Sequence, residues 1–240
     1  MIRTLTQAAA WIETVGLAPL FPKADVVLPS LWEQVNGSAE TNWAVRDADG
    51  GFVAWTDEMG FLWSAKDELP ARGLACVGKH LARVATCVAP SLVPTLVAAA
   101  EPYEPEGAES TVVDAVTELG ALTGPALREA AGLEKKAVER AVASLHRRLV
   151  LTNSHLVDQD GPWGALAHDL LARKWKVPRT LPGREDARRE LALRFLDAAG
   201  EMTAADLAGP LGWRRTDAAA VLDEVAEGRD GESFRIWARR

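Results

Sequence analysis

Hydrophobic residues in the middle of the chain recur at helical spacing in three successive segments. In residues 110–120, Ser110 or Thr111 can cap a helix that ends at Gly120. In residues 122–132, Thr123 can cap a helix of barely two turns that ends at Gly132. The third segment starts at residue 133 and its apolar face comprises Leu133, Ala137, Val138, Ala141, Val142, Leu145 and Leu149.

The segment after the third helix changes to β-favouring residues. It continues through a polar turn at Asp158–Gly161 and a return strand that contains Trp163. Three short helices followed by a hairpin are typical of a winged helix-turn-helix domain. We therefore predict such a domain over residues 108–177.

The C-terminal part repeats this outline and predicts a second winged helix-turn-helix over residues 184–240. An amphipathic helix through Leu191 and Phe195 precedes a short helix capped by Thr203 and a third helix that starts at Arg214. A charged turn then leads to a strand with Phe234, Ile236 and Trp237. Two copies of one pattern support each other.

Residues 1–100 form a less regular N-terminal α/β region that is compatible with a divergent winged helix. It has a helix over 4–16, a strand-like start to a short helix near residue 31, and a hairpin about Gly50 and Gly51. The stretches 100–110 and 176–186, each with two prolines and a glycine, read as linkers. The predicted fold class is mainly α with small β-hairpin wings, arranged as tandem winged helix-turn-helix domains.

Composition is that of a globular protein, with 240 residues, 48% hydrophobic and 25% charged. Cys76 and Cys87 lack the paired spacing of a zinc site or a disulfide framework, so we read them as buried apolar residues. The start of the chain lacks the apolar core of a signal peptide, and the most apolar stretch, residues 88–100, is too short for a membrane span. We expect a cytoplasmic protein without a membrane partner.

The third predicted helix of residues 108–177 carries the main functional signal. Lys136, Arg140 and Arg147 fall on its polar face, and Lys135 and Arg148 flank them. On a recognition helix these cations would neutralise phosphates of double-stranded DNA. The alternative is a solvated helix face, which Glu134 and Glu139 and the net charge of -7 favour.

Two further charge patterns bear on partners. A second basic cluster could extend the DNA surface or could be a solvated helix end; it comprises Arg173, Lys174, Lys176, Arg179 and Arg184, beside Trp175. The last predicted helix begins with Arg214 and Arg215 but continues with Asp217, Asp223, Glu224 and Glu227. Phosphate repels an acidic helix, so the C-terminal domain is expected to pack on its neighbours or on a partner protein.

Other candidate chemistry is sparse. His80, His146, His155 and His168 are dispersed, with no spacing for a metal or a catalytic triad. Trp32, Trp43, Trp55 and Trp63 could stack on bases, but a core role is favoured for them. The charged group Asp57, Glu58, Lys66, Asp67 and Glu68 shows no sign of burial, so no acid–base role is assigned to it.

Two stretches, VGLAPLFPKADVVLPSLWEQVNG and FLWSAKDELPARGLACVGK, and the winged helix after them resemble a bacterial AlkZ-like family, which is related to winged-helix DNA glycosylases that unhook interstrand crosslinks. The resemblance implies tandem winged helices around a DNA-binding concavity. Catalysis in those glycosylases uses Gln-apolar-Gln or Gln-apolar-Asp, whereas the nearest match here, Gln34-Val35-Asn36, departs at its third position.

The sequence therefore predicts a DNA-binding protein linked to DNA repair. We assign it no catalytic residue, no metal and no cofactor, and we lean against an enzyme. A DNA glycosylase that acts on damaged bases is the first alternative, and a protein-interaction scaffold is the second.

Overall fold

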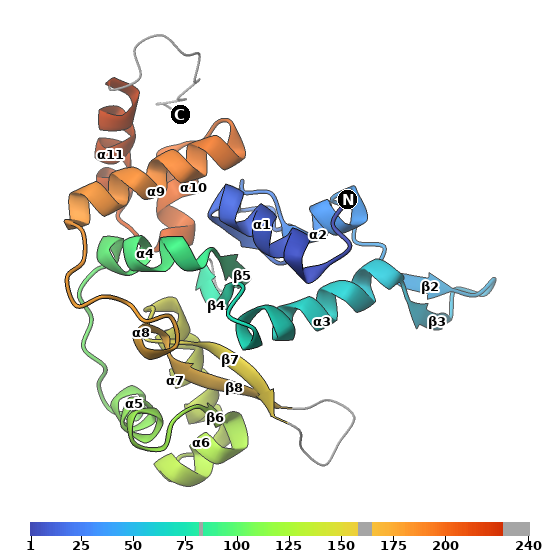
Figure 1. Ribbon diagram of the computed structural model, residues 1–240, viewed down its shortest axis with the longest axis horizontal. Helices are drawn as coiled ribbons and strands as arrows, with labels where there is room; N and C mark the ends of the chain where they lie inside the picture. Colours follow the sequence, from blue (N-terminus) through green and yellow to red (C-terminus); the bar gives the residue numbers. More distant parts are fainter. Residues whose placement is uncertain (82–83, 158–164, 228–240) are drawn as a thin grey trace.

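The computed structural model describes residues 1–81, 84–157 and 165–227. Figure 1 shows an α+β protein in which helices dominate and the sheets are small and antiparallel, as predicted. The predicted turn at 158–161, Trp163, and the predicted last strand with Phe234, Ile236 and Trp237 lie outside the described residues.

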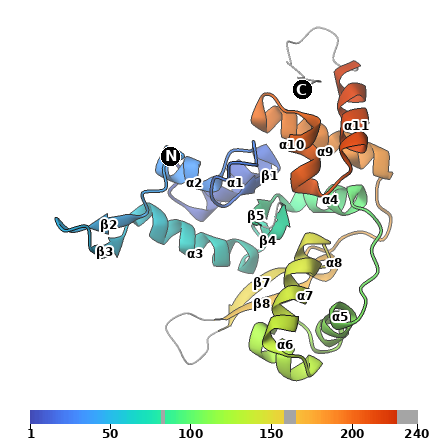
Figure 2. The same cartoon turned by 180° about the vertical axis from the view of Figure 1, so that it is seen from behind.

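The N-terminal part contains a three-stranded antiparallel sheet with helices around it. Its elements are α1 (Leu5–Val15), β1 (Leu17–Pro19), α2 (Leu31–Asn36), β2 (Ala44–Arg46), β3 (Phe52–Trp55), α3 (Asp57–Ala71), β4 (Cys76–Leu81), β5 (Val84–Val88), the 3-10 helix η1 (Pro90–Leu92) and α4 (Val93–Ala99). Strand β5 lies between β1 and β4 and pairs antiparallel with both. Strands β2 and β3 form a separate hairpin that projects away from the body in both views (Figures 1 and 2).

The middle part has the same topology as the N-terminal sheet and its helices. Its elements are α5 (Ala108–Leu119), β6 (Leu122–Thr123), α6 (Gly124–Ala131), α7 (Lys135–Arg147), β7 (Leu151–Val157) and β8 (Ala165–Leu170). The last strand again lies between the other two, in the order β6-β8-β7. The β2–β3 hairpin is thus an insertion between the second and third helices of the first unit.

Local capping explains most helix boundaries in the middle part. The Thr123 hydroxyl accepts from the backbone N–H of Ala126, and Gly132 closes α6 at φ +62°, as predicted. The predicted start of α5 at Ser110 or Thr111 is wrong. The helix begins at Ala108 after Gly107, and Thr111 lies inside it with its hydroxyl donating to the Gly107 carbonyl.

Three helices follow the short helix α8 (Leu171–Lys174) and form the C-terminal part. They are α9 (Arg184–Ala199), α10 (Ala204–Leu211) and α11 (Arg215–Glu227). Thr203 caps α10 as predicted, in a capping box with Asp206. The chain has no helix or strand over 100–107 or 175–183, so the linkers predicted over 100–110 and 176–186 end inside the first turns of α5 and α9.

Side chains pack into two hydrophobic cores. The larger core joins residues from the first hundred positions to residues of α9, α10 and α11, and includes Trp32, Leu62 and Phe195. The smaller core lies within the middle part, between Val112 and Leu151. Strand β4 packs against β7, where the Thr152 hydroxyl donates to the Val77 carbonyl across 3.1 Å. The division into 1–100, 108–177 and 184–240 stays a prediction.

The tryptophans of the N-terminal part do not all belong to its core. Trp32 is fully buried, but Trp43, Trp55 and Trp63 are exposed by 39%, 52% and 47%. The core interpretation is therefore correct for Trp32 and wrong for the other three. Two of these three lie on or beside the projecting hairpin, and Trp63 lies on the adjoining helix α3.

Candidate nucleic-acid interface

Helix α7 buries one face and leaves the opposite face in solvent. Val138, Ala141 and Leu145 belong to the smaller core, where α7 packs against α5. This burial fixes the orientation of the helix, because apolar side chains at three- and four-residue spacing form one stripe. The polar face therefore points outward, and all five predicted DNA-binding residues are exposed.

The structure brings three of these cations onto one line. At 100° per residue, Lys136, Arg140 and Arg147 lie within about 40° of one another around the helix axis. The Arg140 Nε donates to the Lys136 carbonyl across 3.0 Å, which holds the guanidinium along the helix.

Lys135 and Arg148 each interact with a residue outside this row, Glu139 and Tyr103 respectively. The Lys135 ammonium lies 3.9 Å from the Glu139 carboxylate, and both side chains are well exposed. Arg148 is the residue after α7, and its guanidinium lies 4.6 Å from the centre of the Tyr103 ring, in the linker. Tyr103 in turn donates to Glu109. Arg148 therefore fastens the linker to the end of α7.

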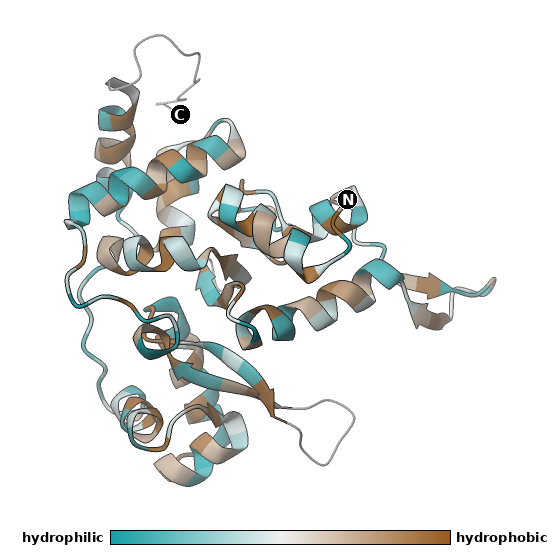
Figure 3. Ribbon diagram, viewed as in Figure 1, coloured by the Kyte–Doolittle hydropathy of each residue, from teal (hydrophilic) through white to brown (hydrophobic). Residues whose placement is uncertain are grey.

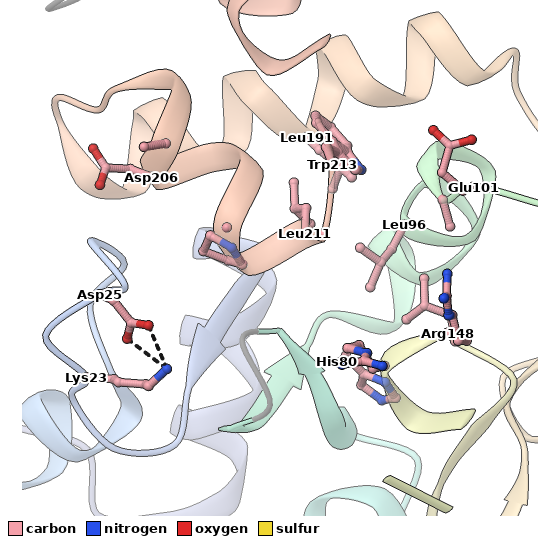
Figure 4. Close-up of a pocket in the computed structure, with 17 residues that line it drawn as sticks. Lys23, Asp25, His80, Leu96, Glu101, Arg148, Leu191, Asp206, Leu211 and Trp213 are labelled. Atoms are coloured by element: carbon pink, nitrogen blue, oxygen red, sulfur yellow. Dashed lines mark hydrogen bonds and ion pairs between the residues drawn. The ribbon is translucent and has the colours of Figure 1, made fainter. Parts of the chain in front are cut away.

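A cavity of about 710 Å³ lies where the three parts of the chain meet, and Arg147 and Arg148 line one side of it. Figure 4 shows its charged lining residues. Lys23 and Asp25 pair across 2.8 Å, and Glu101 accepts from Arg184 and Arg188. These charged groups are thus already paired within the chain. Trp213 lines the cavity beneath the guanidinium of Arg188, but Gln34 does not line it.

Three histidines meet at the junction of the N-terminal and middle parts, although they are dispersed in the sequence. The His80 Nδ1 lies 2.9 Å from the His146 carbonyl, and the His146 Nε2 lies 3.1 Å from the His168 Nδ1. The Lys79 backbone N–H donates to the His146 Nδ1. Since that nitrogen accepts, His146 must carry its proton on Nε2 and donate to His168. We call His80, His146 and His168 the histidine cluster.

Burial keeps the histidine cluster neutral. It lowers the pKa of His80 to about 4 and that of His146 well below its usual 6.5. The pKa of His168 also falls to about 4, through burial and the positive charge of Lys79. Hence the contact between α7 and β4 rests on uncharged imidazoles.

Lys79 is a cation that sequence reasoning did not single out. Its side chain is exposed on β4, yet its charge acts on His146 at the end of α7. The two residues are far apart in the sequence, so no local motif links them. Only the packing of β4 against α7 places Lys79 beside the cationic helix.

The other two third helices carry acidic residues instead. Helix α3 contains four carboxylates against Lys66 and packs along β7. On α11, Asp217 pairs with Arg188 and Glu224 pairs with Arg189, both on α9. The acidic face of α11 is thus partly neutralised within the C-terminal part.

Two of the five cations of the second basic cluster, Arg173 and Arg184, are engaged by internal contacts. The Arg173 guanidinium pairs with Asp169 and donates to the Val116 carbonyl across 2.8 Å. Arg184 pairs with Glu101. Arg173 thus ties α8 to α5, and Arg184 ties the first linker to α9.

The Gln34-Val35-Asn36 segment closes helix α2. Val35 is buried, and the Gln34 carbonyl accepts from the backbone of Ile2. The Asn36 amide donates to the carbonyls of Ser38 and Glu40. All three residues thus make structural contacts at the end of α2.

The part of the chain that the structure describes has neither a candidate metal site nor a candidate membrane-spanning helix. No three His, Cys, Asp or Glu side chains there are grouped so that they could hold a metal ion. Within the same ranges, no helix is both long and apolar enough to cross a membrane.

The fold defines an α+β protein made of helical units with small antiparallel sheets. A model of the AlkZ-related family matches residues 2–196, which is most of the chain. The protein therefore belongs to the AlkZ-related family, as the resemblance of its sequence predicted. No curated protein and no solved structure matches it.

Proposed function

We propose that this protein binds double-stranded DNA through tandem winged helices, with α7 against the sugar-phosphate backbone. Membership of the AlkZ-related family supports a DNA-related role. The shared order of helices and strands in the N-terminal and middle parts supports the winged-helix interpretation. The three helices of the C-terminal part are proposed as a further unit of the same kind.

The exposed cationic face of α7 is the observation that carries this proposal. Phosphate contacts supply most of the affinity of DNA-binding proteins, so a row of exposed cations on the third helix is the feature they require. Lys136, Arg140 and Arg147 form this row, with Lys135 and Arg148 at its sides. Acidic surfaces elsewhere would confine the DNA to this face.

A salt series with a fluorescent duplex tests the proposal. Lys136→Ala/Arg140→Ala should weaken binding and make the plot of log affinity against log salt shallower by about one unit for each phosphate that is no longer neutralised. Arg147 is left intact because it borders the cavity between the three parts. Fluorescence anisotropy gives the affinity at each salt concentration.

The matched control is Arg214→Ala/Arg215→Ala, which also removes two exposed cations, at the start of α11. It should bind DNA like the wild type. Equal losses of affinity in the two variants would mean that only net charge matters. If the wild type stays folded and binds no duplex at low salt, the row on α7 is a solvated helix face.

A DNA glycosylase is the alternative that the family and the central cavity favour. The cavity is large enough for a base and has Trp213 in its wall. Lys23 and Asp25 in its lining pair with each other, however, Glu101 pairs with Arg188, and the Gln34 segment lies elsewhere. We therefore base the proposal on binding and assign no catalytic residue.

A protein partner is the remaining alternative for the C-terminal part. Asp223 and Glu224 are exposed on α11, and Glu224 is engaged by Arg189. Such an acidic face suits a basic protein surface better than a phosphate backbone.

A further inference from the structure

The β2–β3 hairpin exposes more apolar surface than a lone hairpin normally does. Val45, Phe52, Val53 and Trp55 are exposed by between 47% and 58%. Figure 3 shows the hydrophobic strands at the far end of α3, projecting away from the rest of the molecule. Among the described strands, β3 pairs only with β2, so its outer edge has no partner.

Strand β3 lacks the charged residues that usually protect such an edge. Its four residues, Phe52–Trp55, include neither a charged side chain nor a proline. A two-stranded ribbon on its own is also marginally stable in water. The Phe52 and Trp55 rings contact each other with centroids 5.0 Å apart, and they remain largely in solvent. A further strand would shield both rings and complete the sheet.

The hairpin is poorly suited to DNA. Its turn carries Asp47 and Asp49, which phosphate repels. Its one cation, Arg46, donates to the Gly50 carbonyl across 2.9 Å and stabilises the turn instead. Aromatic side chains next to an acidic tip therefore favour a protein occupant of the edge.

We propose that β3 pairs antiparallel with β3 of a second copy of this chain. The Thr56 N–H donates to the Trp43 carbonyl, on the paired side of β3. Successive residues of a strand direct their N–H and C=O groups to opposite sides, so those of the preceding residue, Trp55, point to the open edge of β3. An uncharged strand is complementary to itself across a two-fold axis. The antiparallel arrangement also places the two acidic turns at opposite ends, away from each other.

Light scattering across a dilution series measures this association. The short strand predicts a weak dimer, with a dissociation constant of about micromolar or above. Val53→Lys/Trp55→Lys should leave only monomer, because the charges repel across the two-fold axis. The matched control, Val27→Lys/Leu119→Lys, also replaces two exposed apolar residues and should associate like the wild type. Circular dichroism verifies that each variant is folded.

Cysteine cross-linking gives an independent measurement. Cys76 and Cys87, the only cysteines in the sequence, are fully buried. In Ala54→Cys the new thiol lies mid-strand, so two copies should form a disulfide under mild oxidation. Ala71→Cys, on an exposed site at the other end of α3, should not.

The proposal is overturned if the wild type is a monomer at every concentration and Ala54→Cys cross-links no more than Ala71→Cys. A hairpin variant that lowers duplex affinity without changing the mass would assign the aromatic residues to DNA instead. DNA binding by α7 can fail or succeed independently of either result.

Discussion

At the scale of single residues, the histidine cluster links the N-terminal and middle parts through neutral imidazoles. The His80 Nδ1 is held by the His146 carbonyl, and its Nε2 lies 3.5 Å from the Cys76 sulfur. The positive charge of Lys79 opposes the protonation of His146 and His168. A proton on any of the three would place a charge at the junction between β4 and α7.

Stability should therefore fall as the pH drops below the ordinary histidine pKa. In the unfolded chain His80 takes up a proton near pH 6.5, whereas in the folded protein its pKa is about 4. The free energy of unfolding is thus unaffected by this residue above pH 7. It falls by about 2 kcal/mol for this residue between pH 7 and pH 5, and the loss levels off below pH 4.

Urea unfolding of wild type and His80→Gln at pH 7 and pH 5 measures this effect. The glutamine amide does not titrate, so the variant should lose about 2 kcal/mol less than the wild type. His155→Gln, at an exposed position, should behave like the wild type. An unchanged pH dependence in His80→Gln would show that His80 does not contribute.

Burial of single residues could be predicted from the sequence only where residue type decides it. Cys76 and Cys87 were expected to be buried and are. The histidine cluster could not be predicted, because its members come from β4, α7 and β8, and only the packing of two sheets brings them together.

At the scale of elements, the capping box of α10 offers a local test. The Thr203 hydroxyl accepts from the backbone of Asp206, and the Asp206 carboxylate accepts from the Thr203 backbone N–H. Thr203→Ala should lower the free energy of unfolding by about 1 kcal/mol. In Thr216→Ala the missing hydroxyl bonds the partly exposed Asp217 side chain, and stability should change by less than about 0.5 kcal/mol. Thermal or urea denaturation measures both, and equal losses would contradict the capping role.

Helix ends were predictable where one side chain decides them. Thr123, Thr203 and Gly132 act within a single turn, so their roles follow from local sequence. The start of α5 was mispredicted because Gly107 begins the helix without a side-chain cap. Trp43, Trp55 and Trp63 are exposed although tryptophan is usually buried, and for Trp43 and Trp55 the reason is that the hairpin projects from the body.

At the scale of the whole molecule, Arg188 attaches the C-terminal helices to the rest. Its guanidinium pairs with Glu101 and Asp217, donates to the Ala99 carbonyl, and lies 4.9 Å from the centre of the Trp213 ring. Arg188→Met keeps the length of the side chain but leaves these acceptors without their donor. We expect the free energy of unfolding to fall by about 2 to 3 kcal/mol, as judged by urea denaturation.

The neighbouring Arg189 provides the control for Arg188. It makes two ion pairs as well, with Asp186 and Glu224, but its side chain is 41% exposed. Water screens such pairs, so Arg189→Met should change stability by less than about 1 kcal/mol. A comparable loss in both variants would mean that the burial of Arg188 is unimportant.

The placement of the three parts could not be predicted from the sequence. The linkers were visible as proline- and glycine-containing stretches, and the cationic face of α7 followed from helical periodicity. Whether that face would remain exposed depended on the packing of α7 against β4. The pairing of α11 with α9 likewise required the fold, because Arg188 and Arg189 precede their partners by an entire helix–turn–helix.

The two cores have different consequences for synthesis on the ribosome. The smaller core draws on one continuous segment between Val112 and Leu151, so it can form while the chain is still being made. The larger core needs α9 to α11 as well as the first hundred residues. The half of this core that is made first keeps apolar surface exposed until α9 to α11 have been made. A nascent chain stalled after the middle part would therefore carry a finished α7 with its exposed cationic face on an unfinished protein, and such a chain is a natural substrate for chaperones.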